Sequence, residues 1–182
     1  MIRNIRFAEL RPEPWRNGGG STVEVARSGA TDDFDWRISI ATISANGPFS
    51  VIAGVDRCLV VLDGSVVLAC GDAAPVRLDA LTAPFHFDGS ANTEATLPDG
   101  PATVLNIMTR HEGQPVVVWY DGDMASGESG TFCFLNMTVT WTMAADGQAP
   151  VVVEPFDALL YDGTAPASIA SANGIWVKLP NS

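Results

Sequence analysis

Short apolar segments with a period of two residues, ended by turn-forming pairs, most limit the folds open to this chain. Asp-Gly or Asn-Gly pairs recur along it, among them those at 46–47, 63–64, 88–89, 99–100, 121–122, 146–147, 162–163 and 173–174. Glycine in such pairs readily adopts the backbone angles of tight hairpin turns. No long stretch shows convincing 3.6-residue spacing. The pattern therefore predicts an all-β protein.

The segments that alternate or are rich in β-branched residues are the expected strands. They are Thr22–Ala26, Trp36–Ile43, Val55–Leu62, Val66–Ala69, Phe85–Phe87, Ala102–Thr109, Val116–Tyr120, Thr131–Met143, Val151–Val153, Ala158–Tyr161 and Ile175–Leu179. The polar segment Arg110–Pro115 interrupts this pattern near the middle of 182 residues, a length that suits one domain or two small ones. We expect two small β-barrels packed as one unit, with residues 1–110 in the first and 111–182 in the second. A single large sandwich is the alternative.

Charge and cysteine content exclude several classes of partner. With 21 acidic and 10 basic side chains, the formal net charge of −11 repels phosphate backbones and anionic lipid. We therefore expect neither nucleic acid nor membrane as a partner. Cys58, Cys70 and Cys133 lack C-x-x-C spacing and lie among apolar residues, which predicts buried, reduced thiols. Residues 1–10 contain no apolar signal-peptide core, so we expect a cytoplasmic protein.

The histidine content argues against a dedicated metal site. A transition metal needs three or four converging nitrogen, oxygen or sulfur ligands. The chain contains only His86 and His111, and no His-x-His pair. We expect no metal and no cofactor; three carboxylates with one histidine would be an unusual alternative.

Two arginines lie on otherwise apolar strand faces. Alternation places Arg37 with Ser39 and Ala41, and Arg57 with Val55, Leu59 and Val61. A guanidinium inside a barrel must be paired, because an isolated charge in a low dielectric is costly. Its partner is either an internal carboxylate such as Glu24 or a bound anion, and the sequence leaves both open.

The most distinctive segment, Pro14–Thr22, contains three consecutive glycines. These glycines allow a steep turn and close approach of the backbone to another group. A phosphate-binding loop would need a following helix or a lysine among the glycines, and the segment has neither, so nucleotide binding is not expected. The loop either contacts a ligand or only folds against the mouth of a barrel.

His86 and Asp88 share one face of a predicted strand. This spacing is compatible with a histidine–carboxylate dyad for general-base chemistry. However, Asp88 also precedes Gly89, and aspartate before glycine is typical of a turn. Both interpretations remain open.

Several of these segments occur together in an order typical of one family. They are Pro14–Gly20 with Thr22 and Glu24, Trp36–Ala41, Gly47–Ser50, Gly54–Arg57, Phe87–Gly89 and Asn106–Thr109. From about Pro14 to Thr109 the chain resembles the HutD/Ves family. The resemblance implies a double cupin of the RmlC-like superfamily without the usual metal ligands. It also implies a link to histidine utilisation, in which members are thought to restrain the pathway by sensing an intermediate, with N-formylglutamate the favoured candidate.

The chain departs from the family pattern at Arg16, where lysine is usual, and at Val104, where aspartate is common. We expect a non-enzymatic protein that binds a small carboxylate metabolite and regulates histidine utilisation or a related stress response. The expected ligand-binding residues are Trp15, Asn17, Arg37, Ser39, Phe49, Arg57 and Asn106. The alternatives are a metal-free cupin isomerase or lyase using His86 with Asp88, and a regulator that acts by binding another protein. The chain is also a candidate homodimer.

Overall fold

The computed structural model describes residues 2–31, 33–80, 82–110, 116–120, 129–137, 139–143, 150–164 and 174–180. Their regular structure consists of β-strands and one short 3-10 helix, η1 (Phe7–Glu9), which confirms the prediction of an all-β protein. No helix in the described part of the chain is long and apolar enough to cross a membrane.

The chain divides into two compact units. We call Arg11–Gln114 the central unit, and Met1–Leu10 together with Pro115–Ser182 the terminal unit. The ranges expected from the sequence were 1–110 and 111–182, so the structure differs mainly in placing the first ten residues with the second unit. In sequence, the central unit is thus an insertion within the terminal unit.

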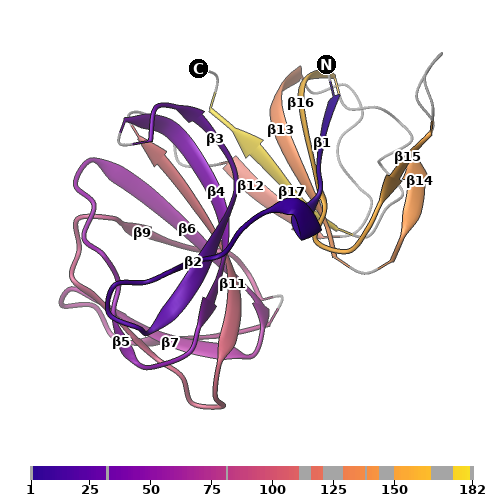
Figure 1. The fold of residues 1–182 in the computed structure, drawn as a ribbon. Helices are drawn as coiled ribbons and strands as arrows, with labels where there is room; N and C mark the ends of the chain where they lie inside the picture. Colours follow the sequence, from indigo (N-terminus) through magenta and orange to yellow (C-terminus); the bar gives the residue numbers. More distant parts are fainter. Residues whose placement is uncertain are drawn as a thin grey trace. The chain divides into compact units, whose positions relative to one another are not determined.

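Two antiparallel sheets form the central unit (Figure 1). The strands of the six-stranded sheet, in spatial order, are β2 (Glu13–Pro14), β3 (Gly20–Gly29), β4 (Phe34–Ile43), β11 (Ala102–Arg110), β6 (Val55–Asp63) and β9 (Phe85–Asp88). Those of the four-stranded sheet are β5 (Gly47–Pro48), β10 (Thr93–Thr96), β7 (Ser65–Cys70) and β8 (Val76–Asp79). Their apolar faces share one core, in which Leu59 and Val104 from the first sheet pack with Val66 and Leu68 from the second.

The terminal unit contains a five-stranded sheet and a separate two-stranded pair. The sheet order is β1 (Ile2–Ile5), β16 (Ala158–Thr164), β13 (Ser129–Asn136), β17 (Gly174–Leu179) and β12 (Val116–Tyr120), and the pair is β14 (Trp141–Met143) with β15 (Val151–Val153). Aromatic side chains dominate its core: the rings of Phe134 and Trp176 lie 4.7 Å apart, and those of Phe132 and Tyr161 lie 5.4 Å apart.

The N-terminal residues belong to this unit because β1 pairs with β16, from Ile2 opposite Tyr161 to Ile5 opposite Ala158. The buried carboxylate of Asp157 adds a second attachment. It accepts a hydrogen bond from the Phe7 backbone N–H at 2.9 Å, and its Oδ2 lies 3.1 Å from Arg6 Nε. These partners are separated by about 150 residues in sequence, so local patterns cannot predict the pairing.

Two further local predictions need correction. The single strand expected over Thr131–Met143 is divided, since β13 ends at Asn136 and β14 begins at Trp141. The fully buried Asn136 side chain donates to the Val139 carbonyl oxygen at 2.9 Å, which stabilises the break. The pair Asp162-Gly163 lies inside β16 rather than in a turn, with Gly163 directly opposite Gly130 of β13.

Candidate functional site

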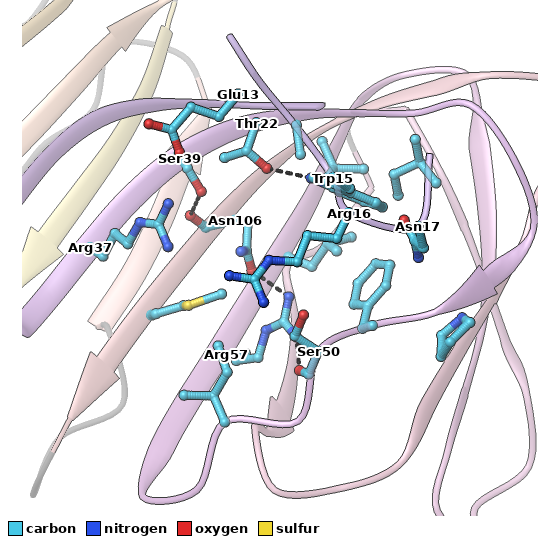
Figure 2. Close-up of a pocket in the computed structure, with 18 of the residues that line it drawn as sticks. Glu13, Trp15, Arg16, Asn17, Thr22, Arg37, Ser39, Ser50, Arg57 and Asn106 are labelled. Atoms are coloured by element: carbon cyan, nitrogen blue, oxygen red, sulfur yellow. Dashed lines mark hydrogen bonds between the residues drawn. The ribbon is translucent and has the colours of Figure 1, made fainter. Parts of the chain in front are cut away.

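The central unit contains a cavity of about 630 Å³. Its walls come from β4, β6 and β11, from the glycine-rich loop, and from the segment after β5 (Figure 2). All of the residues expected to bind a ligand line it, namely Trp15, Asn17, Arg37, Ser39, Phe49, Arg57 and Asn106. The structure therefore brings together side chains that the sequence distributes over 90 positions.

Strand register explains how the two arginines reach one cavity. Strand β11 lies between β4 and β6, and its Met108 is directly opposite both Arg37 and Arg57. Neighbouring strands are about 4.8 Å apart, so the Cα atoms of the two arginines are about 10 Å apart. Two residues along β11, Asn106 is opposite both Ser39 and Leu59. Because side chains two apart share a face, these rows all point into the cavity.

Among the described residues, Arg57 is held by its neighbours without an acidic partner. Its side chain is only 6% exposed, and its guanidinium lies 4.9 Å from the ring centres of both Phe49 and Phe87. Nη2 donates to Asn106 Oδ1 at 3.3 Å, and Nη1 donates to the Ser50 carbonyl oxygen at 3.4 Å. Within the described part of the chain, Nε has no hydrogen-bond partner and no carboxylate pairs with this guanidinium.

Burial disfavours the charged form of Arg57. Removal from water lowers its pKa from 12.5 to about 10, and the nearby charge of Arg37 acts in the same direction. Arg57 is still protonated at neutral pH. A pKa difference of this size corresponds to a free-energy cost on the order of 3 kcal/mol. An anion beside the guanidinium would recover part of that cost, because an opposite charge favours the protonated form.

Unlike Arg57, Arg37 pairs with a carboxylate in the part of the chain that the structure describes. Its Nε lies 2.9 Å from Oε2 of Glu24, a residue of neighbouring strand β3. Glu24 also pairs with Arg27, whose Nε lies 3.5 Å from Oε1. The sequence left two possible partners for each arginine, an internal carboxylate or a bound anion. The structure gives Arg37 an internal carboxylate, so a bound anion remains a hypothesis for Arg57.

The glycine-rich loop is fixed by hydrogen bonds at both ends. Trp15 pairs with Gly20 through its backbone N–H at 2.9 Å, and its indole N–H donates to Thr22 Oγ1 at 2.7 Å. Asn17 Oδ1 accepts from the Gly19 N–H at 3.0 Å, so this oxygen supports the loop itself. A Cβ atom on Gly20 would collide with the Thr42 carbonyl oxygen and lie 3.2 Å from the Trp15 ring. Close packing at position 20 therefore requires glycine.

Neutral hydrogen-bonding groups lie next to the arginines. Ser39 Oγ donates to the Asn106 carbonyl oxygen at 3.4 Å, a long hydrogen bond. Asn106 Oδ1 accepts a hydrogen bond from Arg57. The amide nitrogen of Asn106 therefore faces away from that contact, and its N–H groups can donate to a ligand. Trp15 and Phe49 form an aromatic wall with their rings 6.4 Å apart.

The cavity also contains residues that sequence reasoning did not select, among them Glu13, Arg16, Thr22 and Met108. Two of these had a recognisable signal. Arg16 lies between Trp15 and Asn17 in the same loop, and Met108 is two residues beyond Asn106 on the same strand face. Glu13 and Thr22 are opposite each other in the pairing of β2 with β3, which only the fold reveals.

The structure places His86 and Asp88 away from the cavity. Both side chains are exposed on the edge strand β9, and neither lines the cavity. Asp88 accepts a hydrogen bond from the Ser90 N–H at 2.7 Å, which lowers the pKa of its carboxyl group. This is the contact of a turn residue, so the geometry gives no support to a dyad. His111 lies outside the described residues.

Where the structure describes the chain, it shows no cluster of three or more His, Cys, Asp or Glu side chains that could hold a metal ion. Arginine, amide and aromatic groups dominate the cavity instead. Such a donor set suits an organic anion better than a metal cation, because guanidinium groups and amide N–H groups donate hydrogen bonds to oxygen acceptors.

A family model described as HutD matches residues 7–177. The chain belongs to the HutD family. Protein Ves of Citrobacter koseri is 40% identical to it over 113 residues, which cover 59% of the chain and 59% of Protein Ves. The chain thus matches about three-fifths of the length of this curated relative.

Two solved structures resemble the HutD-family chain over almost its whole length. A conserved protein of unknown function from Pseudomonas aeruginosa PAO1 has a TM-score of 0.74 and 26% identity, over 100% of this chain and 94% of the other. HutD from Pseudomonas fluorescens SBW25, described as a formate condition, has a TM-score of 0.71 and 26% identity, over 98% of this chain and 94% of the other. The name HutD suggests a link between the family and histidine utilisation.

Proposed function

We propose that this chain is a non-enzymatic protein that binds a small carboxylate and thereby regulates histidine utilisation or a related stress response. The observation that carries the proposal is the buried Arg57 guanidinium, which lines a cavity and pairs with no carboxylate among the described residues. A buried cation without an opposite charge is costly, and a carboxylate fits the planar guanidinium fork.

The surroundings of Arg57 support binding rather than a purely structural role. Phe49 and Phe87 flank the guanidinium, and Asn106 and Ser50 hold its ends by long hydrogen bonds of 3.3 and 3.4 Å. These contacts orient the group without neutralising it. A ligand carboxylate can then bind with little further ordering of the protein, which favours affinity.

The choice of ligand draws on the family. The related HutD from P. fluorescens is described in a formate condition, and formate is the smallest carboxylate. N-formylglutamate, the intermediate favoured by the family resemblance, combines carboxylates with a formyl amide that can bond to Asn106. We propose it as the first ligand to examine, with formate, glutamate and urocanate beside it.

Thermal unfolding with millimolar ligand tests this proposal. At about 100 times the dissociation constant, a ligand that binds only the folded state adds roughly 2.7 kcal/mol, or about 5–10 °C in Tm. We expect Arg57→Ala to remove the shift and Arg37→Ala to reduce it less, because Arg37 is already paired with Glu24.

Arg11→Ala is the matched control for this experiment, since Arg11 is exposed, lies in the same unit and does not line the cavity. Each variant is compared with its own ligand-free Tm, which separates lost binding from lost stability. If none of the carboxylates raises the Tm of the wild type, the proposed function is wrong. Conversion of N-formylglutamate by the purified protein would contradict the non-enzymatic part.

A further inference from the structure

Arg16 is an exposed cation directed into the cavity. It lies in the glycine-rich loop between Trp15 and Asn17, and it lines the same cavity as Arg57. Figure 2 shows its side chain reaching from the loop toward Asn106 and Arg57, while Glu13 lies with Thr22 and Ser39. In the described part of the chain, Arg16 takes part in no hydrogen bond or ion pair.

The loop holds the backbone of Arg16 in place. Gly18 donates to the Trp15 carbonyl oxygen at 3.0 Å, and the Gly19 carbonyl oxygen accepts from the backbone N–H groups of Ser44 and Ala45 at 2.8 and 3.2 Å. Together with the Trp15 contacts described above, these bonds connect the loop to the end of β4. The Arg16 side chain extends from this fixed backbone over the cavity.

The guanidinium groups of Arg16 and Arg57 line the same cavity. An anion that binds between them is attracted by both positive charges. Arg37 also lines the cavity, but its positive charge is already paired with the Glu24 carboxylate through Nε. A carboxylate has two oxygens and about four acceptor positions, enough to accept from both forks at once.

We propose that Arg16 is a specificity-determining residue of this site, and that the ligand carboxylate binds between Arg16 and Arg57. The inference rests on the proposed carboxylate-binding function and narrows it: the ligand must present an ionised carboxylate with both oxygens free. Amides and esters of the same shape are excluded, because they lack the charge and offer fewer acceptor positions.

Titration calorimetry with formate and N-formylglutamate tests this inference, with formamide as the uncharged probe. We expect Arg16→Gln to weaken carboxylate binding about fivefold at low salt, as for an exposed ion pair, and Arg16→Lys to weaken it less because the charge remains. The difference in carboxylate affinity between Arg16→Gln and the wild type should become smaller at high salt, where exposed charges are screened. Arg11→Gln makes the same charge change outside the cavity and should leave affinity unchanged.

The Arg57→Lys background tests whether both arginines hold the same carboxylate. If they do, the loss caused by Arg16→Gln should differ between this background and the wild type, because groups that share one partner are not additive. Equal carboxylate affinity of Arg16→Gln and Arg11→Gln would overturn the role of Arg16 while leaving the proposed function standing. Equal binding of formamide and formate would contradict the need for a charged carboxylate, and with it both the role of Arg16 and the carboxylate preference of the proposed function. Absence of any carboxylate binding to the wild type would refute both.

Discussion

At the scale of single residues, burial and partner decide what a side chain does. Arg37 and Arg57 lie on equivalent strand faces, opposite the same methionine. Within the described residues, however, only Arg37 has a carboxylate at its guanidinium. Arg57 instead lies between two phenylalanine rings. The sequence treats the two as equals, whereas the structure makes Arg57 the stronger candidate for an anion.

The cysteines show the same dependence on burial, and they permit a prediction. Cys58 and Cys133 are fully buried, and removal from water raises the pKa of each thiol to about 12. Cys70, which the sequence predicts to be buried, is partly exposed at the end of β7. We expect a thiol reagent at pH 7 to modify Cys70 first and the other two only after unfolding, since the thiolate is the reactive form.

Mass spectrometry of peptides after timed labelling measures this order. The raised pKa values also make stability depend on pH, because folding disfavours the thiolate forms of Cys58 and Cys133. The contribution of the two protonated thiols to stability is complete below about pH 8.5 and declines as the pH rises toward 12. Rapid modification of Cys58 or Cys133 in the native protein would contradict their burial.

At the scale of elements, the glycine-rich loop and strand β11 build the site together. Strand β11 supplies Asn106 and Met108 between the two arginine-bearing strands. The loop supplies Trp15, Arg16 and Asn17 from the other side of the cavity wall. Close packing of Trp15 on Gly20 joins the loop to the sheet. The shape of the loop therefore depends on having glycine, which has no side chain, at position 20.

This dependence predicts the effect of Gly20→Ala. The added methyl group meets the Thr42 backbone and the Trp15 ring, so we expect a loss of about 1–3 kcal/mol and a Tm lower by about 3–10 °C. Gly19→Ala is the control, since the atoms nearest to its Cβ belong to the Asn17 side chain, the first at 3.3 Å, and not to the backbone. Differential scanning calorimetry measures both. A Tm for Gly20→Ala equal to that of Gly19→Ala would show that the loop adjusts freely.

At the scale of the whole molecule, the terminal unit is assembled from both ends of the chain. Residues 2–5 add strand β1 beside β16, and Asp157 holds the following residues through Phe7 and Arg6. Asp157 also accepts from the Glu154 N–H at 3.0 Å, so one buried carboxylate connects two distant segments. The central unit lies between these segments in sequence.

We therefore expect Asp157→Ala to destabilise the protein by about 2–4 kcal/mol, because it leaves two partly buried N–H groups without their acceptor and Arg6 without its nearest partner. Glu154→Gln is the control, since its ion pair with Arg6 is exposed and should contribute less than about 1 kcal/mol. Urea unfolding measures the difference. Hydrogen exchange should show lost protection in β1 and β16; unchanged protection there would mean that Asp157 does not attach the N-terminus.

The sequence by itself determined the all-β class, most of the longer strands and the face that each arginine shares, because a period of two residues is a local property of the backbone. It did not reveal the short strands β1, β8 and β10. It also grouped Trp15, Asn17, Ser39, Phe49 and Asn106 as candidates that the structure places around one cavity. The tertiary structure alone decided which arginine meets Glu24, that Glu13 and Thr22 join the cavity wall, and that residues 2–5 pair with β16. Those outcomes depend on contacts between residues far apart in the chain, and such contacts leave no local period to detect.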